Sequence, residues 1–177
     1  MKAAVIYKSK SGYTKNYAEW ISEALGAELF QGGVVRIEKL KEYDTLIFGG
    51  GLYASGINGI KTMKKSINLY PTKNIIIYTT GASPGREDEI DSVFKKNFTQ
   101  QEQEAIRFFY LRGGFDYSKC TAIDKVLMKM LEVILKNKKN LAPDERGMLN
   151  AYKTPMDFTK KENTEELVEY VKSLKNP

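Results

Sequence analysis

The residues most suited to chemistry lie in one short segment near the start of the chain. Glycine and hydroxyl side chains alternate with lysine and tyrosine in the run Ser9-Lys10-Ser11-Gly12-Tyr13-Thr14. A loop of this kind, when it opens a helix, offers an anion free backbone N–H groups, hydroxyl donors and the positive end of the helix dipole. We therefore predict a phosphate site here, although an ordinary Ser/Thr helix cap would have a similar composition.

Two common nucleotide motifs fit the chain poorly. A GxxxxGK[ST] loop is missing at the segment above, and after Gly51–Gly56 the residues are Ile57 and Asn58 instead of Lys and Ser/Thr. The run Gly49-x-Gly51-x-x-Ala54 formally matches a dinucleotide fingerprint, but no acidic residue stands about 20 positions later. We interpret these glycines as a place where backbone approaches a planar ligand. Tyr53 either stacks on that ligand or covers the edge of the core.

The composition excludes several classes of site. The chain has no histidine and a single cysteine, Cys120, so it cannot form a Ser/His/Asp triad, a Cys/His dyad, a histidine metal site or an internal disulfide. We expect no metal, and we expect a bound cofactor to carry any redox chemistry. With 177 residues, of which 42% are hydrophobic and 28% charged, the chain suits one folded domain over residues 1–177.

The charge balance indicates an anionic partner. The chain has 28 Lys and Arg residues against 22 Asp and Glu residues, which gives a net charge of +6 and a pI near 9.2. Acidic residues are interspersed among the basic ones, with no RNP-like aromatic motif and no Arg-rich tract, so nucleic acid is not expected. No apolar stretch approaches about 18 residues and no signal-peptide pattern opens the chain, so we expect a cytoplasmic protein.

Hydrophobic spacing predicts an alternation of strands and helices. Short apolar runs predict strands at residues 3–7, 27–30, 43–48, 74–80 and 107–111, and periodic apolar positions predict helices at 14–25, 57–69 and 86–97. A capping-box spacing at Thr159 and Glu162 predicts the start of the last helix. This order is typical of parallel strands joined by right-handed crossovers, with helices on both faces of the sheet.

One segment, about 113–156, interrupts this alternation. Residues 123–136 within it form a predicted amphipathic helix, with Lys125, Lys129 and Lys136 among its apolar residues Ile123, Val126, Leu127, Met130 and Ile134. Such a helix fits an anionic lipid surface, which would give peripheral contact with the inner face of a membrane. It fits equally a helix that packs on its own domain, and the sequence leaves both interpretations open.

The start of the chain carries a family resemblance. The order Val5-Ile6-Tyr7-x-Ser9-x-x-Gly12-x-Thr14-x-x-x-Ala18-x-x-Ile21 resembles the flavodoxin signature at every defined position. The resemblance implies an α/β, flavodoxin-like three-layer sandwich with a five-stranded parallel sheet of order 2-1-3-4-5 and an extra helical insertion after strand 5. It also implies FMN as the cofactor. The phosphate would then bind Ser9, Ser11, Gly12, Tyr13 and Thr14, with Lys10 adding charge, and the ring would lie near Leu52, Tyr53, Ala54, Thr80, Gly81 and Ala82.

The insertion resembles a narrower group. Residues 110–117, Tyr-Leu-Arg-Gly-Gly-Phe-Asp-Tyr, and the basic helix after them are similar to the insert of the flavodoxin-like, quinone-dependent protoporphyrinogen dehydrogenases of bacteria. This resemblance implies that the insert, with Gly113 and Gly114 at its start, lies beside the flavin. The insert has less arginine and tryptophan than that group, which leaves the substrate open.

We expect an FMN-dependent oxidoreductase that transfers electrons or hydride through the flavin, so no catalytic side chain is assigned. Its partner would be a redox protein or a small organic substrate such as a quinone. An electron-carrier flavodoxin is the first alternative, although such carriers tend to be acidic at the flavin edge and this chain is basic. An FMN-binding protein with a regulatory, non-catalytic role is the second alternative.

Overall fold

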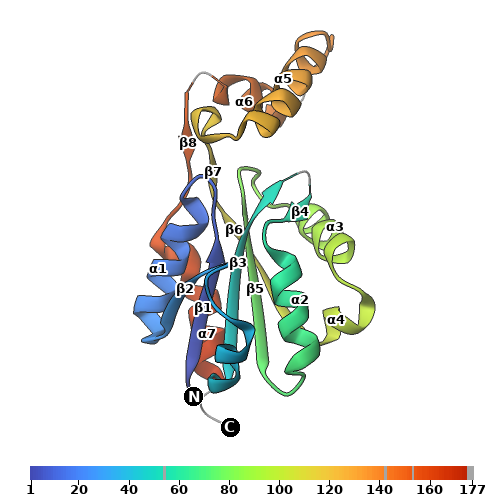
Figure 1. Ribbon diagram of the computed structural model, residues 1–177. Helices are drawn as coiled ribbons and strands as arrows, with labels where there is room; N and C mark the ends of the chain where they lie inside the picture. Colours follow the sequence, from blue (N-terminus) through green and yellow to red (C-terminus); the bar gives the residue numbers. More distant parts are fainter. Residues whose placement is uncertain (54, 142, 153, 175–177) are drawn as a thin grey trace.

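The structure is a computed structural model that describes residues 1–174 except 54, 142 and 153; at 123, 127, 144 and 148 it describes the backbone alone. Five parallel strands form one sheet in the order β2-β1-β3-β5-β6, with helices on both faces (Figure 1). The strands are β1 (Ala3–Lys8), β2 (Glu28–Gln31), β3 (Thr45–Tyr53), β5 (Asn74–Gly81) and β6 (Ile106–Arg112). The predicted sandwich and its strand order are therefore confirmed.

The helices divide between the two faces of the sheet. One face is covered by α1 (Tyr13–Leu25) and α7 (Glu165–Ser173), and the other by η1 (Ile37–Glu42), α2 (Ile60–Leu69) and α3 (Glu87–Asn97). The smaller elements are β4 (Gly56–Ile57), α4 (Gln100–Glu104) and η3 (Lys161–Thr164). The insertion contains β7 (Gly114–Phe115), η2 (Tyr117–Lys119), α5 (Ala122–Lys136), α6 (Pro143–Ala151) and β8 (Met156–Asp157).

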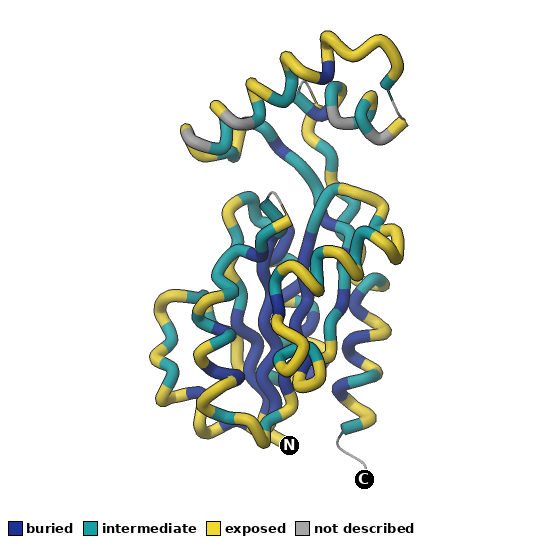
Figure 2. The backbone as a smooth tube through the Cα atoms, turned by 90° about the vertical axis from the view of Figure 1, so that its right-hand side faces the viewer, coloured by how far each residue is buried: buried dark blue, intermediate teal, exposed yellow. Residues whose placement is uncertain are grey.

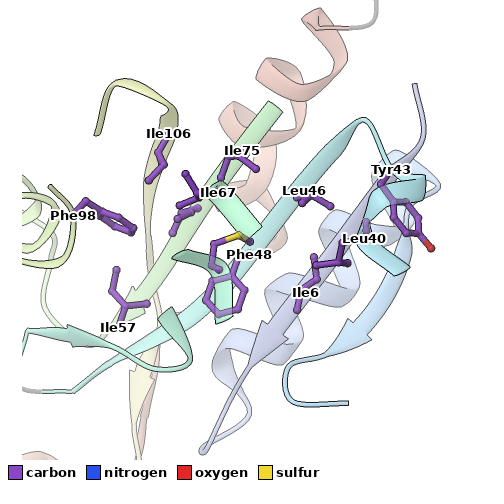
Figure 3. Packing of buried hydrophobic residues seen from close by; sticks show 13 residues of the cluster. Ile6, Leu40, Tyr43, Leu46, Phe48, Ile57, Ile67, Ile75, Phe98 and Ile106 are labelled. Carbon is purple, nitrogen blue, oxygen red and sulfur yellow. The ribbon is translucent and has the colours of Figure 1, made fainter. Parts of the chain in front are cut away.

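Alternate residues along each buried strand supply the two halves of the core. On β3, Leu46 and Phe48 pack under η1, α2 and α3, while Ile47 between them packs under α1 and α7. On β5, Ile75 and Ile76 divide in the same way. Figure 3 shows the half of the core that lies under η1, α2 and α3. Both faces of the central strands are buried, which explains why these strands appear in the sequence as continuous apolar runs.

Two predicted helix starts are wrong by a few residues. The helix predicted from residue 57 begins at Ile60, because Gly56–Ile57 pairs with the end of β3 as strand β4. Thr159 caps no helix: its backbone N–H and its hydroxyl both donate to Asp157 Oδ1, at 2.8 and 2.7 Å. Helix α7 therefore begins only at Glu165.

The insertion stands on a two-stranded neck, residues 113–115 and 156–158, at the carboxyl end of β6. Strand β7 pairs antiparallel with β8, and the Phe158 N–H donates to the Gly113 carbonyl at 2.9 Å. Arg112, just before the neck, lies with its guanidinium 3.8 Å from the centre of the Phe158 ring. Beyond the neck, α5 and α6 lie at the far end of the molecule (Figure 1), and Figure 2 shows that much of α5 is exposed.

The apolar side predicted for α5 is not packed on the domain where it is described. Val126, Met130 and Ile134 share one side of the helix and are 62%, 60% and 62% exposed. The predictions for Ile123 and Leu127 concern side chains outside the described part of the chain. Internal packing therefore does not account for these three exposed residues.

One buried tyrosine joins the two ends of the insertion to the rest of the domain. The Tyr17 hydroxyl, on α1, donates to the carbonyl of Arg112 at 2.6 Å. The same oxygen accepts from the Lys160 N–H at 3.4 Å and from Asn163 Nδ2 at 2.7 Å. The residues just before and just after the insertion are thus hydrogen-bonded to the same atom, the Tyr17 hydroxyl oxygen.

We expect Tyr17→Phe to lower the free energy of unfolding by about 1 to 3 kcal/mol, because a buried carbonyl and two donors lose their common partner while the ring still packs. Urea unfolding measures the change. Tyr70→Phe is the matched control, since the Tyr70 hydroxyl makes one 3.2 Å bond to the Ile37 carbonyl. Equal losses in the two variants would contradict the role assigned to Tyr17.

Candidate cofactor site

A cavity of about 530 Å³ lies at the carboxyl edge of the sheet, between the sheet and the insertion. From the core domain it is lined by Lys10, Ser11, Tyr13, Thr14, Gly51, Leu52, Tyr53, Ser55, Thr80, Gly81, Ala82 and Ser83. From the insertion it is lined by Gly114, Phe115, Asp116, Lys119, Cys120, Asp124 and Met128. Its volume is in the range of pockets that hold small organic ligands and cofactors.

The loop between β1 and α1 presents an open helix N-terminus to this cavity. Gly12 has φ of 100°, a conformation that favours glycine, and its N–H donates to Ser9 Oγ at 3.0 Å. Among the described residues no side chain caps α1, and the first turn of the helix holds no acidic residue. The first N–H groups of the helix are therefore available to an external anion, and the positive end of the dipole adds to its attraction.

Helix α1 is fixed on the sheet at its first turn. Thr14 is 3% exposed, and its hydroxyl shares a 2.7 Å hydrogen bond with the hydroxyl of Thr80 at the end of β5. The Tyr78 hydroxyl donates to the Thr14 carbonyl at 3.0 Å. These two bonds set the distance between the first loop and the loop after β5, which are the two walls of the cavity.

Lys10 connects the first loop to the insertion. Its Nζ lies 2.7 Å from Asp124 Oδ2 in the first turn of α5 and 4.2 Å from the centre of the Tyr53 ring. The hydrogen bond from Lys10, with a second from Thr121, lowers the pKa of Asp124. The aspartate is thus a carboxylate at neutral pH, and its ion pair with Lys10 links the first loop to the insertion at the wall of the cavity.

Four other titratable groups of the cavity have pKa values shifted away from neutrality. Burial raises the pKa of the Tyr13 and Tyr53 phenols and of the Cys120 thiol, while a hydrogen bond from Ser118 lowers the pKa of Asp116. Both phenols remain neutral donors, and Cys120 is not an activated thiolate. None of these four groups is poised as a general acid or base near pH 7, so the cavity is suited to a ligand that carries its own chemistry.

The structure brings most of the predicted site residues to this cavity. Ser9 and Gly12 build the first loop without lining the cavity. Gly113 lies in the neck, where its N–H donates to the Gly81 carbonyl at 2.7 Å, so it positions the loop after β5. Ala54 is outside the described residues. That these residues hold the cofactor stays a prediction.

Sequence reasoning missed the insertion residues Phe115, Asp116, Lys119, Cys120, Asp124 and Met128. The similarity of the insertion to an insert beside a flavin indicated the region, but no spacing indicated which side chains face the cavity. Of these residues, Asp124 is the one whose position the sequence could have indicated. It follows Thr121 by three residues, and its N–H donates to the Thr121 hydroxyl, which caps the start of α5.

The glycine run of β3 serves packing as well as ligand approach. A Cβ on Gly49 would lie 2.0 Å from the Tyr78 ring, and one on Gly50 would lie 2.6 Å from the Asn58 carbonyl oxygen. Gly51 is the member of the run that lines the cavity. The chain after it turns back as β4 instead of opening a helix, so a dinucleotide fingerprint has no structural basis here.

Comparison with models of protein families matches residues 4–142 to the family described as Flavodoxin domain. The chain belongs to the flavodoxin family. No curated protein matches its sequence. Membership of this family supports FMN as the cofactor. The residues of the cavity fit FMN, since α1 offers an uncapped helix end for the phosphate, and Gly51 and Gly81 offer glycine backbone beside the space for a ring.

Several solved structures are similar to this flavodoxin domain. Rubredoxin oxygen:oxidoreductase from Desulfovibrio gigas has a TM-score of 0.52 at 12% identity, over 99% of this chain and 37% of that one. A flavoprotein in complex with FMN from Lactobacillus acidophilus NCFM has a TM-score of 0.44 at 17% identity, over 63% and 92%. A flavodoxin from the domain Archaea has a TM-score of 0.41 at 17% identity, over 86% and 97%. At these identities the similarity concerns the fold alone.

We expect Thr14→Ala to weaken FMN binding by about 1 to 3 kcal/mol, roughly 5- to 150-fold in Kd, since a hydroxyl that can donate to the phosphate is lost. Quenching of flavin fluorescence measures the affinity. Riboflavin, which has no phosphate, should lose much less affinity than FMN, because it is affected only by the loss of the Thr14–Thr80 hydrogen bond. Thr14→Ser, which keeps the hydroxyl, should retain most of the FMN affinity. A parallel loss for riboflavin and FMN would place the effect in the fold of the cavity instead of in phosphate binding.

We expect Asp124→Asn to increase amide hydrogen exchange in residues 122–128 by about two- to fivefold, the scale of a surface ion pair. Asp91→Asn, which removes the exposed Lys95–Asp91 pair of 2.6 Å on α3, is the control and should leave α5 unchanged.

The same contact predicts a pH dependence. The folded pKa of Asp124 is lowered, so its stabilising contribution is present above the unfolded value of about 3.9 and is lost as the pH falls through the folded value. After correction for intrinsic exchange rates, α5 of the parent should loosen in this acidic range, and Asp124→Asn should lack that step. An acid response identical in both proteins would rule out the Lys10–Asp124 pair as its cause.

Proposed function

We propose that this flavodoxin domain is an FMN-dependent oxidoreductase whose insertion limits access to the cofactor and selects a small organic acceptor of the quinone type. The observation that carries the proposal is the shared cavity: seven of its lining residues come from the insertion and face the loops after β1, β3 and β5. A domain that only exchanges electrons with other proteins has no need of such a cover over its cofactor.

The chain's own residues bind, orient and shield. FMN, when bound, supplies the electron or hydride transfer. The first loop and the end of α1 hold an anionic group, and Tyr13 and Tyr53 remain neutral phenols that can donate hydrogen bonds inside the cavity. The insertion adds Phe115 and Met128, apolar side chains that restrict water and offer a surface to a ring-shaped acceptor.

The electrons balance with a quinone as the oxidant. In each turnover a reduced donor gives up two electrons and two protons, and one quinone takes up both electrons and both protons to become a hydroquinone. The resemblance of the insertion to protoporphyrinogen dehydrogenases makes protoporphyrinogen one candidate donor. We leave it as a candidate, because the lining residues of the cavity favour flat, largely apolar molecules in general.

We expect a short-chain, water-soluble menaquinone analogue to reoxidise the chemically reduced FMN-loaded protein with saturation kinetics, in the absence of oxygen. Met128→Ser should raise the KM for this quinone several-fold and leave reoxidation by ferricyanide, a small inorganic oxidant, unchanged. Met130→Ser is the matched control: Met130 lies two residues further along α5 and is 60% exposed on another side. Stopped-flow absorbance of the flavin measures both reactions.

Two results would decide against the proposal. Reoxidation by the quinone that is no faster than in buffer alone, combined with rapid exchange with a general flavodoxin reductase, would identify an electron carrier. No turnover with either partner, despite tight FMN binding, would favour the regulatory role.

A further inference from the structure

Helix α5 has an apolar side that the protein does not cover. Val126, Met130, Val133 and Ile134 are 62%, 60%, 51% and 62% exposed. Their spacing of four, seven and eight residues places them on one side of the helix. In the described part of the chain eight large hydrophobic residues are exposed, and these four share one helix, so they form a continuous patch instead of scattered contacts.

Helix α5 packs on the rest of the protein through a different side, which carries Met128 and Leu135. Leu135 is 4% exposed, and Met128 lines the cofactor cavity. The hydroxyl of Tyr152, the residue directly after α6, donates to the Met128 carbonyl at 2.6 Å. Helix α5 is thus apolar on two sides. One side closes the cavity, and the other, which we call the α5 outer face (Val126, Met130, Val133 and Ile134), meets the surroundings.

Lysines border the α5 outer face. On a helical projection Lys125, Lys129 and Lys136 line up along one of its edges, and the side chains of Lys129 and Lys136 are 66% and 62% exposed. Glu132 lies between these two in the sequence and pairs with both, at 2.9 Å from Lys129 Nζ and 2.6 Å from Lys136 Nζ. Residues 122–139 hold five lysines against two acidic residues. An apolar stripe with a basic border is complementary to anionic headgroups above an apolar layer.

The position of the helix suits contact with a flat surface. Figures 1 and 2 show α5 at the end of the molecule furthest from both termini of the chain, beyond the neck. No helix in the described part of the chain is long and apolar enough to cross a membrane. A helix of 15 residues is about 22 Å long and can lie along a surface with its outer face inward.

We propose that the α5 outer face docks on a lipid bilayer that contains anionic headgroups, with α5 lying in the plane of the interface. The inference goes beyond the oxidoreductase function and does not depend on it. Its test uses no flavin signal, so a failure of FMN binding or quinone turnover leaves this result readable.

Vesicle flotation with the full chain tests the proposal directly. The protein should float with vesicles of phosphatidylcholine mixed with phosphatidylglycerol, remain at the bottom with phosphatidylcholine alone, and be released as ionic strength rises. Absence of flotation with the anionic vesicles at low ionic strength overturns the proposal without reference to any variant.

Two sets of variants locate the contact. Lys125→Gln, Lys129→Gln and Lys136→Gln together should lower partitioning by about fivefold per lysine, the effect expected for a basic residue near an anionic surface. Lys15→Gln, Lys65→Gln and Lys172→Gln remove the same net charge from exposed positions outside the insertion and should lower it much less. Equal losses in the two sets would mean that overall charge, and not α5, attracts the protein, and would overturn the proposal.

The apolar arm uses Met130→Gln with Ile134→Gln, which should abolish flotation. The control is Val34→Gln with Leu69→Gln, residues 78% and 60% exposed elsewhere, which should have no effect. Circular dichroism confirms that each protein is folded, as expected for exposed positions. Sedimentation equilibrium without lipid provides the rival outcome: a dimer that Met130→Gln with Ile134→Gln dissociates, in a protein that ignores vesicles, would assign the face to a second copy and overturn the proposal.

Discussion

Parallel pairing of the five strands is the constraint on which the rest of this structure depends. All five strands run in one direction, so the loops after β1, β3, β5 and β6 leave from the same edge of the sheet. The uncapped end of α1 lies at that edge, and the insertion begins there. The loop predicted to bind phosphate, the loops after β3 and β5, and the insertion therefore come together around one cavity, although they are separated by many residues in the sequence.

The parts of the fold that depend on local patterns were predictable. The run Ile75 to Ile77 is apolar because β5 is buried on both faces, and the first helix is marked by apolar positions at helical spacing. The loop between β1 and α1 was predictable for the same reason, because its glycine, its hydroxyls and the helix start are consecutive. That this loop binds phosphate stays a prediction. Elements without an apolar period of their own, such as η1 and α6, were missed.

Features that depend on distant neighbours could not be predicted. Whether Thr159 caps a helix or bonds to Asp157 depends on where the two strands of the neck pair. The Tyr17 hydroxyl bonds to groups 95 and 146 residues away in the sequence. Gly49 appeared to be a ligand-approach glycine, yet its Cβ would overlap the Tyr78 ring on the adjacent strand. The contribution of the insertion to the cavity, including Asp124, likewise depends on how the neck folds back over the sheet.

If Lys10 binds the cofactor phosphate as predicted, the Lys10–Asp124 pair makes cofactor binding and the position of α5 thermodynamically dependent on each other. Lys10 belongs to the loop that would meet a phosphate, and Asp124 belongs to the first turn of α5. An anion that attracts Lys10 competes with Asp124, so it reduces one of the contacts that hold α5 over the cavity. Linkage requires the reverse with the same free energy: any contact that moves the first turn of α5 away from Lys10 changes the affinity of the loop for its anion. With Lys10 in the predicted phosphate site, the insertion would be more than a cover, because the residue that pairs with Asp124 would also contact the ligand.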